Sequence, residues 1–323
     1  MSASTSLTNA LGNGLRKLVG KPARTSAYGL FDVQLKAIIA LSPSLSRFVF
    51  SGEDVAQMRT LAADQRIKIF FPSADGQPPQ LPKHGSWQEA RRGLSAEQSP
   101  PMRTYTIRDL RREALEVDVD FVLHGVNGPA STWATQARIG DRLQMVAPNL
   151  AFDADPGGYE WRPPKNLRTL LLIGDETALP AIAGILEHMA AGLPEVPVQA
   201  FIEVPCEADC LDLTCSGATE LNWLPREVLH CTHGEAMIHA SRELARLPAT
   251  AAGARANIAL EEVDIDRQIL WELAKPGNGD FYAWIAGESA AVMNIRRYLI
   301  TERRLDRSAL TLMGYWRAGR TFD

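Results

Sequence analysis

Apolar and polar residues alternate along the first half of the chain, up to about Asn149. The clearest run extends from Ala114 to His124. One face of that run carries the apolar residues Leu115, Val117, Val119, Phe121 and Leu123. A period of two residues is typical of strands with one buried face, and similar runs lie at residues 32–38, 47–50 and 65–71. These short strands predict a small antiparallel barrel, with one helix at residues 53–63.

The pattern changes after residue 166. Residues 169–173 form a continuous apolar run, as expected for a strand that is buried on both faces. The helix that should follow has one apolar stripe, made of Leu179, Ile182, Ile185, Leu186 and Met189. Further strands are expected at residues 196–204, 281–286 and 310–315, with a helix at residues 289–304. This alternation of strands and helices predicts a parallel sheet covered by helices on both faces.

The two patterns divide the chain into two domains. Residues 153–166 contain three prolines and two glycines and are interpreted as the linker between them. We therefore expect a flexible N-terminal tail at residues 1–29, a β-barrel domain at 30–152, and an α/β domain at 167–323. The tail has no acidic residue, and a loosely docked segment is favoured over a targeting segment.

Composition narrows the possible functions. The 323 residues include 34 Lys and Arg against 38 Asp and Glu, which gives a formal net charge of −4 and argues against a nucleic-acid binder. No apolar run is long enough for a membrane-spanning helix. The four cysteines, Cys206, Cys210, Cys215 and Cys231, fit no standard metal or iron–sulfur spacing, so no metal site is expected. Free thiols in a reducing cytoplasm are the simpler interpretation, and a monomer is compatible with the sequence.

The first candidate for a cofactor-binding segment is a strand that follows a proline-rich loop. It places Arg103, Tyr105 and Thr106 close together. Such a set suits a flavin, because Arg pairs with phosphate, a Tyr ring stacks on the flat ring system and a hydroxyl bonds ring nitrogens. An ordinary half-buried strand would carry the same pattern.

The second candidate is a glycine-containing turn between His124 and Ala134. Gly125 and Gly128 permit close approach of the backbone, and Ser131 or Thr132 is positioned to cap a short helix. A helix N-terminus with free N–H groups is a natural anion site, although a capped helix with nothing bound is common.

The third candidate follows the first parallel strand, where open α/β sheets bind ligands. The turn Gly174-Asp175-Glu176-Thr177-Ala178 lacks the Gly-x-Gly-x-x-Gly fingerprint. Thr177 could cap the helix and meet a phosphate, whereas the two acids must point to ribose, ring or protein. Glu203, at the end of the next strand, has the position of an acid that holds a ribose hydroxyl, which would favour NADH over NADPH.

The fourth candidate combines two C-terminal segments. Gly287 and Glu288 follow a strand and begin a helix. Tyr315, Trp316 and Arg317 lie near the C-terminus, where they could fold over a flat cofactor or anchor the chain end to the core.

Together these motifs resemble the siderophore-interacting protein family, the FAD-dependent NAD(P)H ferric-siderophore reductases. The motifs are, in family order, Arg103-x-Tyr105-Thr106, His124-Gly125-x-x-Gly128-Pro129-Ala130-Ser131-x-Trp133-Ala134, Gly174-Asp175-Glu176-Thr177-Ala178-Leu179-Pro180-Ala181, Ala286-Gly287-Glu288 and Gly314-Tyr315-Trp316-Arg317-x-Gly319. The resemblance implies a ferredoxin-reductase-like fold, with FAD on the barrel and NADH or NADPH on the α/β domain. It also implies that the Arg-x-Tyr-Thr strand holds the flavin and that the Gly-Pro-Ala-Ser turn holds its pyrophosphate.

The same resemblance implies basic side chains that hold anionic ferric siderophores. Lys68 matches the family's lysine-containing strand, and Arg317 and Arg138 are further candidates. The expected function is electron transfer from NAD(P)H through FAD to the ferric siderophore, which releases Fe(II) and needs no general acid or base. Two alternatives stay open, namely a flavin reductase or diaphorase with another acceptor, and a flavin- or siderophore-binding protein that is not a competent reductase.

Overall fold

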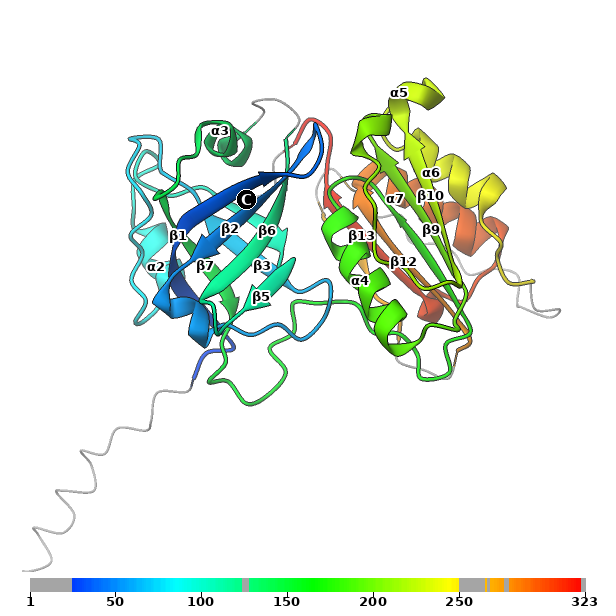
Figure 1. Cartoon of the computed structure of the whole chain (residues 1–323), viewed down its shortest axis with the longest axis horizontal. Helices are drawn as coiled ribbons and strands as arrows, with labels where there is room; N and C mark the ends of the chain where they lie inside the picture. Colours follow the sequence, from blue (N-terminus) through cyan, green and yellow to red (C-terminus); the bar gives the residue numbers. More distant parts are fainter. Residues whose placement is uncertain (1–24, 124–127, 250–264, 266–267, 276–278, 321–323) are drawn as a thin grey trace, which may run out of the picture.

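A computed structural model describes residues 25–123, 128–249, 265, 268–275 and 279–320 of the chain. In it two sheets lie side by side, each with its own helices (Figure 1). The predicted tail falls outside the described residues up to residue 24. The expected fold class, an antiparallel barrel followed by a parallel-sheet domain in a ferredoxin-reductase-like arrangement, is confirmed. The domain limits 30–152 and 167–323 stay a prediction.

The first sheet is antiparallel throughout, in the order β4-β3-β7-β1-β2-β6-β5. Its strands are β1 (Tyr28–Ala40), β2 (Leu45–Ser51), β3 (Arg66–Phe70), β4 (Met102–Thr106), β5 (Asp109–Arg111), β6 (Glu116–Val122) and β7 (Arg142–Pro148). Strand β6 shows why the period of two was informative: Val117, Val119 and Phe121 are buried in the barrel core. Leu115 departs from the prediction, because it lies before the strand at a φ of 57°.

The predicted helix at residues 53–63 is mostly absent. Only the 3-10 turn η1 (Glu53–Gln57) forms, and Met58 is already extended, at φ −81° and ψ 158°. Met58 is fully buried in the barrel core and pairs with Asn149 in an isolated β-bridge. Packing of one apolar side chain therefore overrides the local helical pattern.

The second sheet has the order β10-β9-β8-β12-β13-β11. Its strands are β8 (Thr169–Gly174), β9 (Val198–Val204), β10 (Thr219–Pro225), β11 (Trp271–Glu272), β12 (Phe281–Glu288) and β13 (Leu310–Trp316). All pairs are parallel except β11 with β13, so a short antiparallel strand closes one edge. The sequence did not predict β10 and β11, which are edge strands without an apolar run.

Helices and turns complete the two units. The helices are α2 (Trp87–Arg92), α3 (Pro129–Gln136), α4 (Leu179–Gly192), α5 (Arg226–Leu229), α6 (Glu235–His239) and α7 (Ser289–Arg297). The other turns are η2 (Glu207–Asp209), η3 (Ala240–Leu244), η4 (Tyr298–Glu302) and η5 (Arg307–Ala309). The expected helix at residues 289–304 is α7 continued by the π-helical turn η4.

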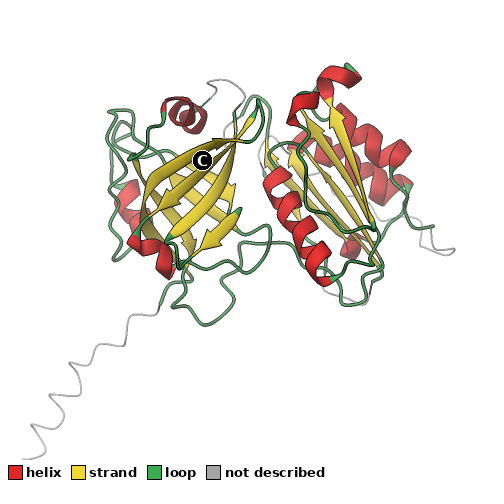
Figure 2. Cartoon of the chain, viewed as in Figure 1, coloured by secondary structure: helices red, strands yellow, loops and turns green. Residues whose placement is uncertain are grey.

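Both faces of the second sheet are covered, as predicted (Figure 2). On β8, Leu170 and Leu172 pack in the cluster that contains α4, whereas Leu171 and Ile173 pack in the cluster that contains α6 and α7. Helix α4 also faces the barrel (Figure 1). A Cβ atom added at Gly184 would lie 3.2 Å from the Cβ of Ala63, so this glycine allows α4 to approach the barrel closely.

The barrel and the α/β unit are joined by direct polar contacts. The turn between β1 and β2 donates to Asp209: Ser42 Oγ lies 2.7 Å and the Ser44 backbone N–H lies 2.9 Å from Asp209 Oδ1. Asp209 is 2% exposed, so these donors replace water around its charge. A second contact joins Arg108, just after β4, to Glu187 on α4.

We predict that the Asp209→Ala variant lowers the free energy of unfolding by about 1–3 kcal/mol, because the buried donors on the β1–β2 turn lose their acceptor. Urea denaturation of the full chain measures this change. The Asp212→Ala variant is the matched control, since Asp212 is an exposed carboxylate in the same segment. Equal denaturation midpoints for the two variants would show that the Asp209 contact does not stabilise the docking of the two units.

Candidate functional site

Strand β4 presents the first group of predicted cofactor residues. The Tyr105 ring packs on Phe121 at a centroid distance of 4.2 Å and an interplanar angle of 28°. Burial raises the pKa of Tyr105, so the phenol stays protonated. Thr106 is buried, and its hydroxyl has no hydrogen-bond partner within the described part of the chain. The Arg103 guanidinium donates to the carbonyl of Met102 at 2.7 Å. A ring, a free hydroxyl and a guanidinium thus lie on one short strand.

The predicted anion-binding turn leads into α3. His124 and Gly125 lie outside the described residues. The N-cap of α3 is Gly128, and not Ser131 or Thr132 as the sequence analysis expected. Both hydroxyls instead donate back to the Gly128 carbonyl, at 3.1 Å for Ser131 and 2.8 Å for Thr132.

Two other predicted residues of α3 belong to the barrel core. Ala130 and Trp133 are each 9% exposed. The Trp133 ring lies 5.5 Å from the rings of both Phe48 and Phe71. These two side chains therefore fix the position of α3 on the barrel, and their direct contact with a cofactor stays a prediction.

Asp175 is the most densely bonded carboxylate of the second unit. It is fully buried directly after β8. Its oxygens accept from the Thr177 backbone N–H at 2.9 Å, the Glu288 backbone N–H at 2.9 Å, Trp316 Nε1 at 2.9 Å and His233 Nε2 at 3.2 Å, and also from the Thr177 hydroxyl. The sequence left ribose, a cofactor ring or protein as possible partners of Asp175, and in this structure the partners are protein groups.

Asp175 and His233 each shift the pKa of the other. Burial alone would raise the pKa of Asp175, but its hydrogen bond to His233 and the other donors outweigh burial, and the pKa is lowered. Burial would likewise lower the pKa of His233, but the hydrogen bond and charge of Asp175 and the charge of Glu176 raise it above 6.5. The pair is therefore stabilised as an ion pair near neutral pH.

Asp175, Glu176 and His233 place ligand atoms within 4.8 Å of one another, a spacing that a metal ion would also require. In this structure protein donors occupy the same oxygens: Glu176 forms a bidentate pair with Arg226, at 2.9 Å for each bond. Within the described residues, the three side chains are therefore satisfied by hydrogen bonds to protein groups.

Glu203 lies at the end of the strand where the sequence predicts it, but its carboxylate is bound by protein groups. It is fully buried near the end of β9. Its oxygens accept from the backbone N–H groups of Gly234 at 2.6 Å and Met237 at 3.0 Å, and from Arg226 at 3.2 Å. Glu203 therefore binds the start of α6 and does not face a ribose in this structure, which removes the earlier argument for NADH.

Gly287 and Glu288 end strand β12 beside Asp175. A Cβ atom at Gly287 would lie 2.6 Å from Asp175 Oδ2, at a φ of 153°. The Glu288 carboxylate caps α7 by accepting from the N–H groups of Ala290 and Ala291. Its other oxygen accepts from Arg317 Nη1 at 2.9 Å. The predicted Arg317 is therefore held by an acid in this structure. Thr177 and Ala178 directly precede α4 at the same edge of the sheet; its N-cap is Ala178 and not Thr177, whose hydroxyl bonds Asp175 instead.

The C-terminal aromatic residues pack against the interface of the two units. Tyr315 lies parallel to Trp271 at 6.0 Å, with an interplanar angle of 13°. The guanidinium of Arg66, from barrel strand β3, lies 4.3 Å from the Trp271 ring. The Trp316 ring contacts His233 edge-on at 4.7 Å. Trp316 thus anchors the end of β13 to the core, one of the two roles considered for it.

Lys68 lies on β3, on the exposed side of the strand. Within the described residues its ammonium has no hydrogen-bond or ion-pair partner. Burial lowers the pKa of Lys68, and the positive charges of Arg66 and Arg91 lower it further. Sequence reasoning missed Arg91, because only the fold brings α2 close to Lys68, and it also passed over Arg66, which shares a face of β3 with Lys68. An anion at this position would relieve the repulsion among the three cations.

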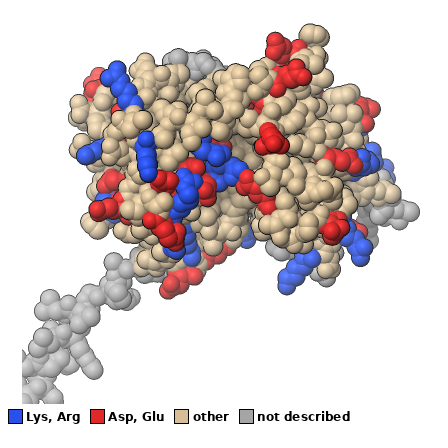
Figure 3. Space-filling view, in the orientation of Figure 1, with Lys and Arg blue, Asp and Glu red and all other residues tan. Residues whose placement is uncertain are grey.

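The other cations of the barrel are arranged differently. On the face formed by β2, β5 and β6, basic and acidic side chains alternate (Figure 3). Arg47 pairs with Asp120 at 2.7 Å and Arg111 with Asp118 at 2.5 Å. The predicted Arg138 is exposed in the turn before β7, whereas Lys68 pairs with Val146 late in that strand. The structure therefore gives Lys68 and Arg138 no direct contact.

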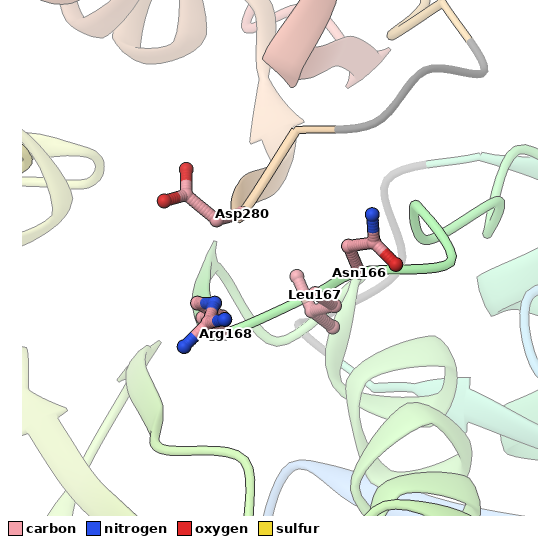
Figure 4. A pocket seen from close by; sticks show the side chains of 4 residues that line it. All are labelled: Asn166, Leu167, Arg168 and Asp280. Atoms are coloured by element: carbon pink, nitrogen blue, oxygen red, sulfur yellow. The ribbon is translucent and has the colours of Figure 1, made fainter.

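One pocket lies away from all of these residues. Asn166, Leu167, Arg168 and Asp280 line it (Figure 4). The Arg168 and Thr169 backbone N–H groups both donate to the Asp280 carbonyl there, directly before β8 and β12 begin. Nucleotides bind at the opposite, carboxyl ends of such strands, so this pocket is not the expected nucleotide site.

The four cysteines are free thiols and partly buried. Cys206 donates its thiol hydrogen to Asp209 Oδ2 at 3.1 Å. No helix among the described residues is both long and apolar enough to cross a bilayer.

Comparison with known proteins gives two family matches that together cover most of the chain. Residues 34–152 match the model of the siderophore-interacting FAD-binding domain. Residues 167–319 match the model of the siderophore-interacting protein. The first match confirms that the barrel is an FAD-binding domain.

Individual relatives cover nearly the whole chain. An uncharacterized protein of Mycobacterium tuberculosis is 32% identical over 87% of this chain and 88% of its own length. The ferric vibriobactin reductase ViuB of Vibrio cholerae is 27% identical over 87% of this chain and 86% of its own length. The crystal structure of a siderophore utilization protein from T. fusca matches with a TM-score of 0.68 at 25% identity, over 91% of this chain and 95% of that chain.

We predict that removal of His233 produces a pH-dependent loss of stability. A raised pKa in the folded state means that the imidazolium stabilises the fold fully below its unfolded pKa of about 6.5, and that this stabilisation is lost as pH rises through the folded pKa. The His233→Ala variant should therefore lose about 1–3 kcal/mol at pH 5.5 and less at pH 9. Denaturation curves of both proteins at each pH measure the difference.

The His84→Ala variant is the control for that experiment, because His84 is exposed in a barrel loop. A deficit of the His233→Ala variant that is equal at pH 5.5 and pH 9 would contradict the ion pair with Asp175 and leave only a packing role for His233.

Proposed function

The chain belongs to the siderophore-interacting protein family, and from that membership we propose that it is an FAD-dependent reductase which transfers electrons from NAD(P)H to ferric siderophores. Membership of this family and the similarity to a ferric vibriobactin reductase support an oxidoreductase. The observation that carries the proposal of a ferric-siderophore substrate is Lys68. Its ammonium lies near Arg66 and Arg91 and has no acidic partner among the described residues. Such a cluster suits an anionic substrate.

The residues on β4 fit the flavin. The Tyr105 ring is held by its contact with Phe121, and the Thr106 hydroxyl is free to bond a ring nitrogen or carbonyl. Arg103, on the same strand, supplies a guanidinium suited to a phosphate. Bound FAD would supply the chemistry that joins a two-electron hydride donor to a one-electron acceptor. The protein's part is to bind and orient both substrates.

The acceptor we propose is Fe(III) held by anionic oxygen ligands. Fe(II) has a lower charge and binds such ligands less tightly, so reduction releases the iron. Lys68 would hold the anionic complex, whereas Arg66 is already paired with Glu160 at 2.7 Å and Arg91 donates to the Pro100 carbonyl at 3.1 Å. No general acid or base is needed for the electron step, and we assign none.

Two alternatives share the same cofactor residues. In the first, the chain is a flavin reductase or diaphorase that uses another acceptor. In the second, it binds flavin or siderophore without competent reduction. The free thiols and the use of NAD(P)H favour a cytoplasmic location for each of them, and a monomer satisfies all three.

We predict that the flavin spectrum of the purified protein bleaches on anaerobic addition of NADH or NADPH and recovers on addition of a ferric siderophore. Visible absorption spectroscopy measures both steps. Bleaching without recovery would support the alternative with another acceptor. A flavin spectrum that neither nucleotide bleaches would support the binding protein, and a protein that takes up no FAD would contradict the proposal.

We predict that the Lys68→Ala variant raises the Michaelis constant for an anionic ferric siderophore about tenfold, which corresponds to 1.4 kcal/mol of lost binding. Oxidation of NAD(P)H by a neutral acceptor should be unchanged, because Lys68 does not serve the nucleotide. The Lys165→Ala variant is the matched control, since it removes the same charge from an exposed position in the linker. An equal loss of activity with the ferric siderophore and with the neutral acceptor would show that Lys68 has a structural role and does not bind the siderophore.

A further inference from the structure

We propose, resting on the function above, that the chain uses NADH in preference to NADPH. The two nucleotides differ by one phosphate on the adenosine ribose, which carries about two negative charges near neutral pH. A protein that binds NADPH must offer a cation to that phosphate. In this structure the arginines that directly follow the sheet strands are already held by acids.

The order of the sheet locates the nucleotide. The chain runs from β8 to β9 and then to β10 in one direction, and β12 and β13 lie on the other side of β8. The switch in direction is therefore between β8 and β12, and a nucleotide binds outside the carboxyl ends of the strands at such a switch. The adenosine ribose extends from the turn after the first strand toward the end of the second, here β9. Its surroundings are the segments that follow β8, β9 and β10.

Those segments carry more acid than base. Asp175 and Glu176 follow β8, and Glu203 lies near the end of β9. Arg226 follows β10, and His233 lies beside Asp175 and Glu176. Among these described side chains, three carboxylates face one guanidinium and one imidazole, and none of them offers an unpaired cation to a phosphate, which would meet the repulsion of the carboxylates.

Arg226 is not available to a phosphate. Its Nη1 lies 2.9 Å from Glu176 and 3.2 Å from Glu203, and its Nη2 lies 2.9 Å from Glu176. The two acids are 4% and 0% exposed at their side chains, so moving Arg226 away would leave two buried carboxylates without their cation. Arg317, which follows β13, is paired with Glu288 in the same way.

A neutral ribose is compatible with this arrangement. The 2′-hydroxyl of NADH donates a hydrogen bond, and carboxylate oxygens at the end of β8 are acceptors. Glu176 is the acid we assign to this role, because among the described residues each of its oxygens accepts only one hydrogen bond, from Arg226, and keeps a second lone pair for a hydroxyl. Glu203 Oε1 already accepts from both Arg226 and the Gly234 backbone N–H. The other oxygen of Glu203 accepts from the Met237 N–H. The same acid that neutralises Arg226 therefore selects against the phosphate.

The test compares kcat/KM for NADH and NADPH with a neutral electron acceptor, using the full chain loaded with FAD. We expect NADH to be favoured at least about tenfold, the equivalent of 1.4 kcal/mol. The Glu176→Gln variant should narrow the ratio several-fold, since it removes one negative charge and releases Arg226 from its bidentate partner. An equal or higher kcat/KM for NADPH in the natural protein would overturn the proposal.

The Glu302→Gln variant is the matched control. Glu302 forms a similar two-bond pair with Arg242, at 2.9 and 3.2 Å, on the turn η4 after α7. This variant should leave the NADH-to-NADPH ratio unchanged. A ratio that shifts equally in both variants would show that total charge, and not the pair of Glu176 with Arg226, sets the preference, which would overturn the assignment of Glu176.

Equilibrium binding separates this inference from the proposed function. Calorimetric titration with ADP-ribose and with 2′-phospho-ADP-ribose needs no flavin reduction and no siderophore. If neither NADH nor NADPH reduces the flavin, the reductase proposal fails, but tighter binding of ADP-ribose still supports the preference. Equal or tighter binding of 2′-phospho-ADP-ribose, or binding of neither fragment, overturns the proposed preference for NADH. This measurement uses the natural protein, so it remains decisive if the Glu176→Gln variant does not fold.

Discussion

The hydrogen bonds that converge on Asp175 are the constraint on which the nucleotide side of the molecule depends. A fully buried carboxylate is tolerated only when donors replace its lost water, and here the donors come from the turn before α4, from β12 and β13, and from the loop that carries His233. The same crowding explains Gly287, where a side chain would collide with the carboxylate. One charge thereby holds the carboxyl ends of three strands in a fixed relation.

Local patterns predicted the elements whose burial is set by their own periodicity. The apolar face of β6 and the apolar stripe of α4 form as expected, because a strand or helix with one apolar face has one way to bury it. The sequence also placed the Arg-x-Tyr-Thr motif on a strand, β4, and the motifs around Asp175 and Glu288 at the ends of β8 and β12. Met58 could not be predicted in this way. Its β-bridge to Asn149 joins residues far apart in the sequence, which local helix or strand propensity does not indicate.

The roles of charged residues were harder to predict for the same reason. The sequence places Glu203 at the end of a strand but does not say whether its oxygens face a ligand or the backbone of Gly234 and Met237. Lys68 was recognisable from its strand, yet Arg66 and Arg91 become its neighbours through strand geometry and through a helix in the following loop. Positions of charges follow from local sequence, whereas their partners follow from the tertiary fold.

The apolar contacts between the two sheets also determine how the molecule can be divided. Leu45 and Val122 of the barrel pack in one cluster with Trp161 and the residues of α4, so the inner face of the α/β unit is completed by barrel side chains. Separating the halves would expose this apolar surface to water on both of them, which couples the stability of each half to the other. A chimera that exchanges either half must carry the β1–β2 turn and its complementary surface with it.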